Sequence, residues 1–168
     1  MAIVAAIDGT PSSRTVVQTA HDVARAFDEE LVVLHVMEQE EYDRIAERAS
    51  GPTSGTPSYP FTPSEGSFSP STGGQSAEGY PVDNAAEDAA TVARQFAEEV
   101  LPEGTEFSTD GRVGEPTEQI LRTADSHDAH MLVIGGRQRS PVGKALFGST
   151  TQSVLLNSER PIVTCMHE

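Results

Sequence analysis

The fold of this chain is decided by its last third, which contains the stretch Met131-Leu-Val-Ile-Gly-Gly-Arg-Gln-Arg-Ser-Pro-Val-Gly-Lys-Ala-Leu-Phe-Gly-Ser-Thr-Thr-Gln-Ser-Val-Leu-Leu156. Its opening apolar run, which Gly135 and Gly136 end, predicts a short buried strand. A basic loop follows, and a helical pattern begins after Gly148, where Ser149 to Thr151 are good N-cap residues. Such a connection can hold a phosphate, because exposed backbone N–H groups and the helix dipole favour an anion. An ordinary strand-to-helix connection in an α/β domain has the same local pattern and stays an alternative.

The patterns for other phosphate and catalytic chemistry fit poorly. In the P-loop pattern G-x-x-x-x-G-K-[ST], Gln138 stands at the first glycine and Ala145 at the hydroxyl position, which argues against a Walker-type NTPase. No G-x-S-x-G nucleophile motif is present, and we expect no catalytic residue. His127 and His130 have a metal-like spacing but no thiolate support, so we expect no metal site.

The charge of the chain is strongly negative. Among its 168 residues, 26 are acidic and 11 basic, for a net charge of −15, and Lys144 is the only lysine. A lysine-poor, acidic surface stays hydrated in concentrated salt, so we expect a protein of a high-salt cytoplasm; an acidic mesophilic protein is the alternative. The charge argues against partners such as nucleic acid or an anionic membrane. No signal peptide or transmembrane stretch is recognisable, so we expect a soluble, cytoplasmic protein.

Short apolar runs alternate with segments of helical spacing along the chain. We expect strands at 2–7, 31–36, 105–113, 131–134 and 161–166, the last containing Cys165 as a small core residue. We expect helices at 11–27, 38–49, 83–101, from 116 onward and 150–157, with Thr10 as the N-cap before Pro11. Parallel strands joined by helices predict an α/β fold with a five-stranded parallel sheet and helices on both faces.

The segment Ser50–Pro81 differs in composition from the rest. Ser, Thr, Gly and Pro make up 24 of its 32 residues, and no apolar periodicity survives. We interpret 1–168 as a single domain with 50–81 as a flexible low-complexity insertion. The aromatic residues within it leave open a lid or docking segment.

In a parallel sheet of this kind, ligands bind at the carboxyl ends of the strands, beside the point where strand order reverses. With the first strand central, this crevice contains Asp8, Val36 and the Gly135 loop. Asp8 can accept a hydrogen bond from a ribose hydroxyl or cap the first turn. We interpret His35 as a hydrogen-bonded core residue, and the run Glu38 to Glu41 as solvated acidic surface.

Four stretches resemble the universal stress protein family: Ile3 to Gly9, Leu34 to Val36, Gly114 to Pro116 and Gly135 to Thr150. The resemblance covers nearly the whole chain except Ser50–Pro81. Its most specific part is the family's nucleotide signature, which is Gly, two residues, Gly, nine residues, Gly, and Ser or Thr. Gly135, Gly148 and Ser149 match the signature, whereas Gln138 replaces its middle glycine.

The resemblance implies a homodimer of three-layer α/β sandwiches, with strand order 3-2-1-4-5 and an adenine-nucleotide alpha-hydrolase-like fold, paired through the last strand at 161–166. It implies a stress-response or regulatory protein that binds ATP, with or without Mg²⁺, or AMP, and acts on an unknown regulatory protein partner. The implied nucleotide-binding residues are Ala6, Asp8, Val36, Ile134, Gly135, Gln138, Gly148, Ser149 and Thr150. A nucleotide-free dimeric interaction module, with Gln138 filling the site, and a weak ATPase remain the alternatives.

Overall fold

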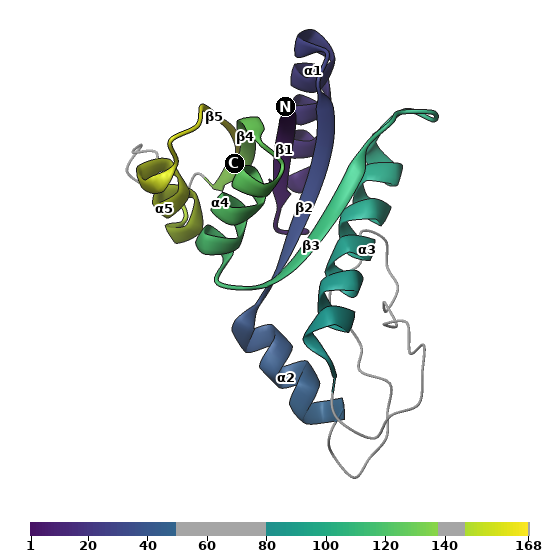
Figure 1. Ribbon diagram of the computed structural model, residues 1–168, viewed down its shortest axis with the longest axis vertical. Helices are drawn as coiled ribbons and strands as arrows, with labels where there is room; N and C mark the ends of the chain where they lie inside the picture. The colour runs from purple at the N-terminus through teal and green to yellow at the C-terminus, as the bar shows by residue number, and fades with distance from the viewer. Residues whose placement is uncertain (50–79, 138–146, 168) are drawn as a thin grey trace.

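The computed structural model describes residues 1–49, 80–137 and 147–167 of the chain. Within these ranges the chain alternates strands and helices (Figure 1). The strands are β1 (Ala2–Ile7), β2 (Glu30–Glu38), β3 (Ser108–Gly114), β4 (Ala129–Arg137) and β5 (Ile162–His167). The helices are α1 (Ser13–Phe27), α2 (Gln39–Ala49), α3 (Val82–Val100), α4 (Pro116–Ser126) and α5 (Ser149–Asn157).

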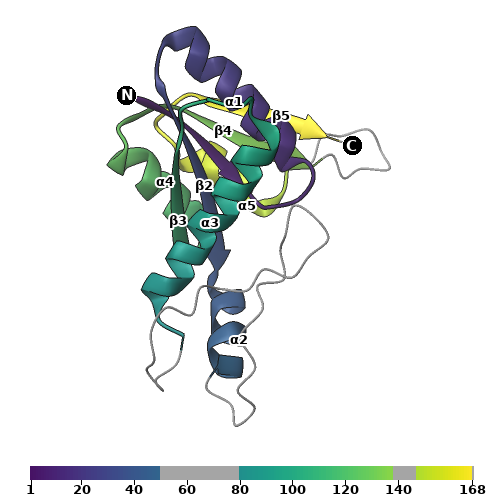
Figure 2. The same cartoon turned by 90° about the vertical axis from the view of Figure 1, so that its right-hand side faces the viewer.

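The strands form one parallel sheet in the order β3-β2-β1-β4-β5, which confirms the expected fold class. The central strand β1 is apolar throughout, and its side chains belong to two hydrophobic cores, because neighbouring side chains of a strand point to opposite faces of the sheet. Ile3, Ala5 and Ile7 pack with α1 and α3 on one face, whereas Val4 and Ala6 pack with α4 and α5 on the other. Figure 2 shows α1 and α3 in front of the strands and α4 and α5 behind them.

A third apolar cluster lies where α2 projects beyond the carboxyl end of β2 (Figure 1). It joins Ile45 of α2 to Tyr80, which is buried and lies just before α3. The Tyr42 hydroxyl donates to the Tyr80 carbonyl oxygen at 2.8 Å, and the Tyr80 hydroxyl donates to Asp88. Of the segment expected to be a flexible insertion, therefore, Tyr80 is part of a core; residues 50–79 lie outside the described part of the chain.

Two helix starts and one strand end differ from the sequence expectations. Helix α1 begins at Ser13 with Ser12 as N-cap, not at Pro11 after Thr10, because a turn held by Asp8 comes first. Strand β4 does not end before Gly135 but continues through Arg137, because Gly135 and Gly136 still pair with β5. Helix α5 begins at Ser149, and its N-cap is Gly148.

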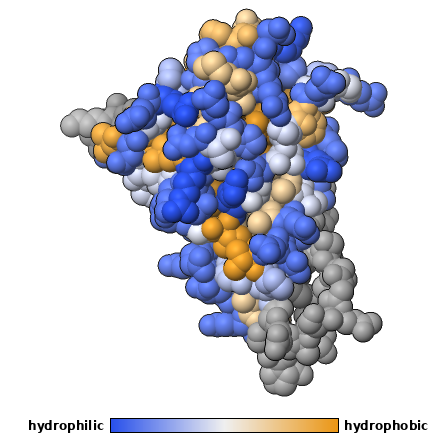
Figure 3. All heavy atoms as spheres, viewed as in Figure 1, coloured by the Kyte–Doolittle hydropathy of each residue, from blue (hydrophilic) through white to orange (hydrophobic). Residues whose placement is uncertain are grey.

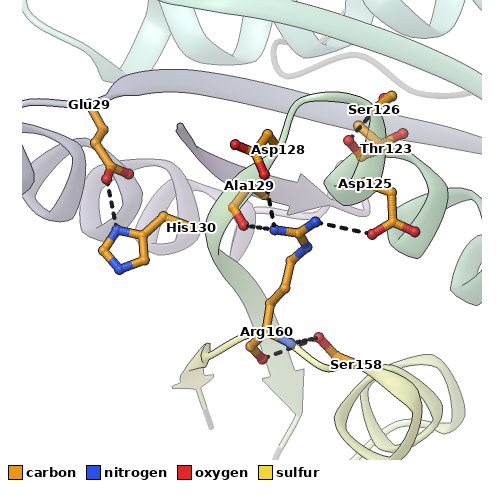
Figure 4. Close-up of polar contacts among 9 residues, drawn as sticks. All are labelled: Glu29, Thr123, Asp125, Ser126, Asp128, Ala129, His130, Ser158 and Arg160. Atoms are coloured by element: carbon orange, nitrogen blue, oxygen red, sulfur yellow. Dashed lines mark hydrogen bonds and ion pairs between the residues drawn. The ribbon is translucent and has the colours of Figure 1, made fainter.

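The two histidines with metal-like spacing contact separate carboxylates. His127 Nε2 lies 3.2 Å from Asp110, and His130 Nδ1 lies 2.8 Å from Glu29. Figure 4 shows the His130–Glu29 pair beside Arg160. The Arg160 guanidinium donates to the Ala129 carbonyl oxygen and, at 3.2 Å, to the Asp125 carboxylate. Among the described residues, no cluster of three or more potential metal ligands exists, and no helix is long and apolar enough to cross a membrane.

Gly111 lets α3 approach β3 without any intervening side chain. We expect Gly111→Ala to lower the free energy of unfolding by about 3 kcal/mol. The added Cβ would overlap two backbone atoms of α3, the Ala86 carbonyl oxygen and the Ala90 nitrogen. Urea denaturation measures the loss. Gly104→Ala is the matched control, since its Cβ meets nothing within 4 Å and only the φ of +82° is strained, at about 1 kcal/mol. Equal losses in the two variants would contradict close packing at Gly111.

Candidate functional site

The described residues enclose a cavity of about 370 Å³ at the carboxyl ends of β1, β2 and β4. The strand register explains its place. Ala6 of β1 pairs with both Leu34 of β2 and Ile134 of β4, and β1 stops at Ile7 while β2 continues to Glu38 and β4 to Arg137. The space beyond the end of β1 therefore lies between its two neighbours, beside the reversal of strand order. The helices α1, α2, α4 and α5 complete the walls. The lining residues are Ala6, Ile7, Asp8, Ser12, Ser13, Val16, His35, Val36, Glu38, Glu41, Pro116, Ile120, Ile134, Gly135, Gly148, Ser149, Thr150, Thr151 and Val154.

The structure brings together all but one of the residues that the sequence proposed as a nucleotide site. These residues line the same cavity: Ala6, Asp8, Val36, Ile134, Gly135, Gly148, Ser149 and Thr150. The remaining one, Gln138, lies outside the described residues. The common location is a finding about geometry, and the binding role of each residue stays a prediction.

Asp8 organises the turn that leads from β1 into α1. Its Oδ1 accepts hydrogen bonds from the Thr10 backbone nitrogen at 3.0 Å, the Thr10 hydroxyl at 2.7 Å and the Ser13 hydroxyl at 2.9 Å. Gly9 within this turn has a φ of 76°. Asp8 therefore stabilises the turn that precedes α1, whereas the N-cap of that helix is Ser12. The carboxylate also lines the cavity, where a ribose hydroxyl remains a predicted partner.

The first turn of α5 presents backbone donors to the cavity. Its N-cap, Gly148, has no side chain to cap the helix, and the first intrahelical bond runs from the Gln152 nitrogen to the Gly148 carbonyl oxygen at 2.9 Å. The N–H groups of Ser149 and Thr150 precede that bond and have no partner within the helix. The predicted N-cap role of Ser149 to Thr151 is thus wrong; instead, the Thr151 hydroxyl donates to the Gly135 carbonyl oxygen at 2.7 Å and fastens α5 to β4.

His35 forms part of the cavity floor. Its side chain is buried, and its Nδ1 donates to the Ile7 carbonyl oxygen at 3.1 Å, which confirms a hydrogen-bonded core histidine. Burial lowers the pKa of His35, and the Ile7 hydrogen bond and the charge of Asp8 oppose this only in part. The imidazole is therefore neutral at neutral pH, and it is an unfavourable site for an added proton.

Glu38 and Glu41 line the cavity where β2 passes into α2. The interpretation of the whole run Glu38 to Glu41 as solvated surface was therefore wrong for Glu41, whose side chain is half-buried. Burial raises the pKa of Glu41, Arg44 lowers it and the charge of Glu38 raises it further. A signal was present in the sequence, since both residues lie at or just after the carboxyl end of a buried strand, where the crevice of a parallel sheet is found. Charge alone did not reveal it.

The cavity combines apolar walls with an anion-accepting helix start, and it contains no Arg or Lys among the lining residues that the structure describes. The apolar lining residues include Val36 on β2, Ile134 on β4 and Ile120 on α4. Hydroxyl groups and the α5 N-terminus lie at its polar side. This arrangement suits a ligand with one flat apolar part and one anionic part.

Parallel strands in the order 3-2-1-4-5, with helices on both faces, define a three-layer α/β sandwich of the adenine-nucleotide alpha-hydrolase-like type. The sequence model of the Universal stress protein family matches residues 1–54 and 67–165. The chain belongs to the universal stress protein family.

A universal stress protein of Mycolicibacterium smegmatis is 46% identical over 61 residues, which are 36% of this chain and 47% of that protein. The chain therefore matches about half the length of this relative. A solved universal stress protein of Archaeoglobus fulgidus in complex with dAMP is 19% identical, with a TM-score of 0.53 over 98% of this chain and 96% of that one. A universal stress protein solved in complex with cAMP is 17% identical, with a TM-score of 0.55 over 99% and 96% of the two chains.

The buried His35 predicts a pH dependence of stability. Because its folded pKa lies below 6.5, the unfolded chain binds the extra proton first as the pH falls, and the free energy of unfolding declines below about pH 6.5. We expect His35→Gln, which can still donate to the Ile7 carbonyl oxygen but does not titrate, to show a shallower decline. Urea denaturation between pH 7.5 and 5.5 measures both slopes. Equal slopes would show that His35 is not the group responsible.

Proposed function

We propose that this universal stress protein is a regulatory protein that binds an adenine nucleotide, ATP or AMP, in the cavity at the carboxyl ends of β1, β2 and β4. One observation carries the proposal: the cavity joins the apolar walls around Val36 to the open N-terminus of α5. The complexes of two family members with dAMP and cAMP support the same class of ligand.

The contacts follow from the chemistry of the lining residues. The phosphate would lie against the N–H groups and hydroxyls of Ser149 and Thr150, because the α5 dipole favours an anion there. Asp8 would accept from a ribose hydroxyl, and the base would lie between Val36 and Ile134 on the sheet and the first turn of α4. Mg²⁺ would arrive with ATP, on the phosphates, since the described residues contain no preformed cluster of metal ligands.

Calorimetric titration with ATP and with AMP, in the presence of Mg²⁺ and molar KCl, tests the proposal. We expect micromolar binding, which corresponds to about −8 kcal/mol. Ser149→Glu should weaken binding at least about tenfold, because the new carboxylate repels the phosphate at short range while remaining favourable for the helix itself. Gln152→Glu is the matched control: it adds the same charge to the same helix, at an exposed position outside the cavity lining.

No binding of either nucleotide to the protein freed of co-purified nucleotide would overturn the proposal. Gln138→Gly then separates two explanations. Binding gained by that variant would favour a site filled by Gln138 and a nucleotide-free interaction module. Continued absence of binding would exclude the blocked site.

We also propose that the protein is adapted to concentrated salt. The net charge is −15, and the face in Figure 3 is mostly hydrophilic, so salt should relieve strong self-repulsion by shortening the Debye length from about 10 Å at 0.1 M to about 3 Å at 1 M. We expect the melting temperature at pH 7 to rise by several degrees between 0.1 and 2 M KCl. At pH 4.6, the sequence pI, the rise should shrink, and an equal rise at both pH values would contradict the charge explanation.

Three further expectations stay proposals of the same kind. These are a single domain over 1–168 with 50–81 as a flexible insertion, a cytoplasmic location with an unknown regulatory protein partner, and a homodimer paired through 161–166. β5 is the outer strand of the sheet in the described part of the chain, so its free edge is available for pairing with a second copy. The molar mass in solution, measured on the titration samples, tests whether the protein is a dimer, and amide exchange across 50–81 tests the flexibility.

A further inference from the structure

The cavity has two chemically different sides, set by the strand order. α5 follows β4, whereas Glu38 ends β2 and Glu41 lies in the helix after it, so the two features flank the end of β1 from opposite sides. Neighbouring strands lie about 4.8 Å apart, which separates β2 from β4 by roughly 10 Å. A ligand that reaches both sides must therefore be long enough to span three strand ends.

The charges on the two sides fix the direction of such a ligand. The N-terminus of α5 attracts an anion, whereas the carboxylates of Glu38 and Glu41 repel one. An anionic group therefore lies beside α5, and the far end of the ligand must offer hydrogen-bond donors to Glu38 and Glu41. For a nucleotide, the far end is the edge of the base.

The Glu41 carboxylate is placed to accept a donor from a ligand. The side chain is half-buried at the cavity wall, and neither the Glu41 carboxylate nor the Glu38 carboxylate is hydrogen-bonded to any residue that the structure describes. Arg44, one turn along α2, interacts with Glu41 only through its charge, and its own Nε donates to the Glu40 carbonyl oxygen at 3.3 Å. A partly dehydrated carboxylate gains most from a ligand donor, because such charge-assisted bonds are the strong ones.

We propose that Glu41, with Glu38 beside it, selects the base of the bound nucleotide by accepting a hydrogen bond from an exocyclic amino group. This inference rests on the proposed nucleotide function and deepens it. The apolar walls formed by Val36, Pro116 and Ile120 accept a planar ring but cannot distinguish one base from another. The carboxylates supply that distinction, so the site takes a 6-aminopurine in preference to a purine without the amino group.

Paired nucleotides that differ only at carbon 6 of the purine test the inference. AMP and ATP are titrated beside purine riboside 5′-monophosphate and 5′-triphosphate, which carry hydrogen in place of the amino group. We expect the amino compound to bind about tenfold to a hundredfold more tightly, as for a hydrogen bond to a charged group. In Glu41→Ala and Glu38→Ala this ratio should fall, and in the double variant it should approach one.

Glu40→Ala is the matched control. Like Glu41, Glu40 is a carboxylate in the first turn of α2, but it is exposed and does not line the cavity. It should keep the full ratio. The ratio is the readout because loss of any nearby negative charge raises the affinity for all nucleotides alike, and thermal melts confirm that each variant is folded.

The outcomes separate the two proposals. If the nucleotides bind but the amino compound has no advantage, or if the advantage survives in the double variant, the base-selection role is overturned and nucleotide binding stands. If no nucleotide binds, the proposed function itself falls, and the role of Glu41 falls with it.

Discussion

Burial of β1 on both faces is the constraint on which the rest of the structure depends. A strand of six small or branched apolar residues, Ala2–Ile7, has no face that tolerates water, so each face needs its own layer of helices. Its neighbours β2 and β4 pair with it over nearly its whole length and are buried with it. Two cores on either side of one strand produce the three-layer sandwich.

The same constraint creates the cavity. Side chains fill the space beside β1 along its length, but the strand ends at Ile7, and the chain then turns away through the Asp8 hydrogen bonds. α1 and α5 both begin at this edge of the sheet, and the backbone donors of α5 and the small residues Gly135 and Gly148 border the space left above the strand. The site is thus a consequence of where the central strand stops, and its chemistry depends on the helix starts and the two glutamates around it.

Much of this arrangement could be predicted from the sequence. The buried strands are visible because runs such as Leu31 to Val36 are continuously apolar, and the crevice residues Asp8, Val36 and Gly135 follow from strand ends in a parallel sheet. The starts of α1 and α5 could not be predicted well, because Ser and Thr fit an N-cap, a turn or the first helical turn about equally. Thr151 is an example: its hydroxyl bonds to β4, a tertiary contact with no local signal.

Glu41 shows the limit of charge patterns, because the sequence of an acidic run does not indicate which of its carboxylates is partly buried at the cavity wall. Tyr80 shows the same limit for composition. It ends a stretch poor in apolar residues, yet its ring lies in the cluster that also contains Ile45 and packs against Ala49.

That burial has a consequence for chain length. Ala49 and Tyr80 contact one cluster, so both ends of the intervening segment are fixed close together. The entropy of closing a loop grows only with the logarithm of its length, by about 0.6 kcal/mol for each doubling. The segment between these anchors can therefore gain or lose many residues over evolution, or accept an inserted domain in the laboratory, while the sheet keeps its stability.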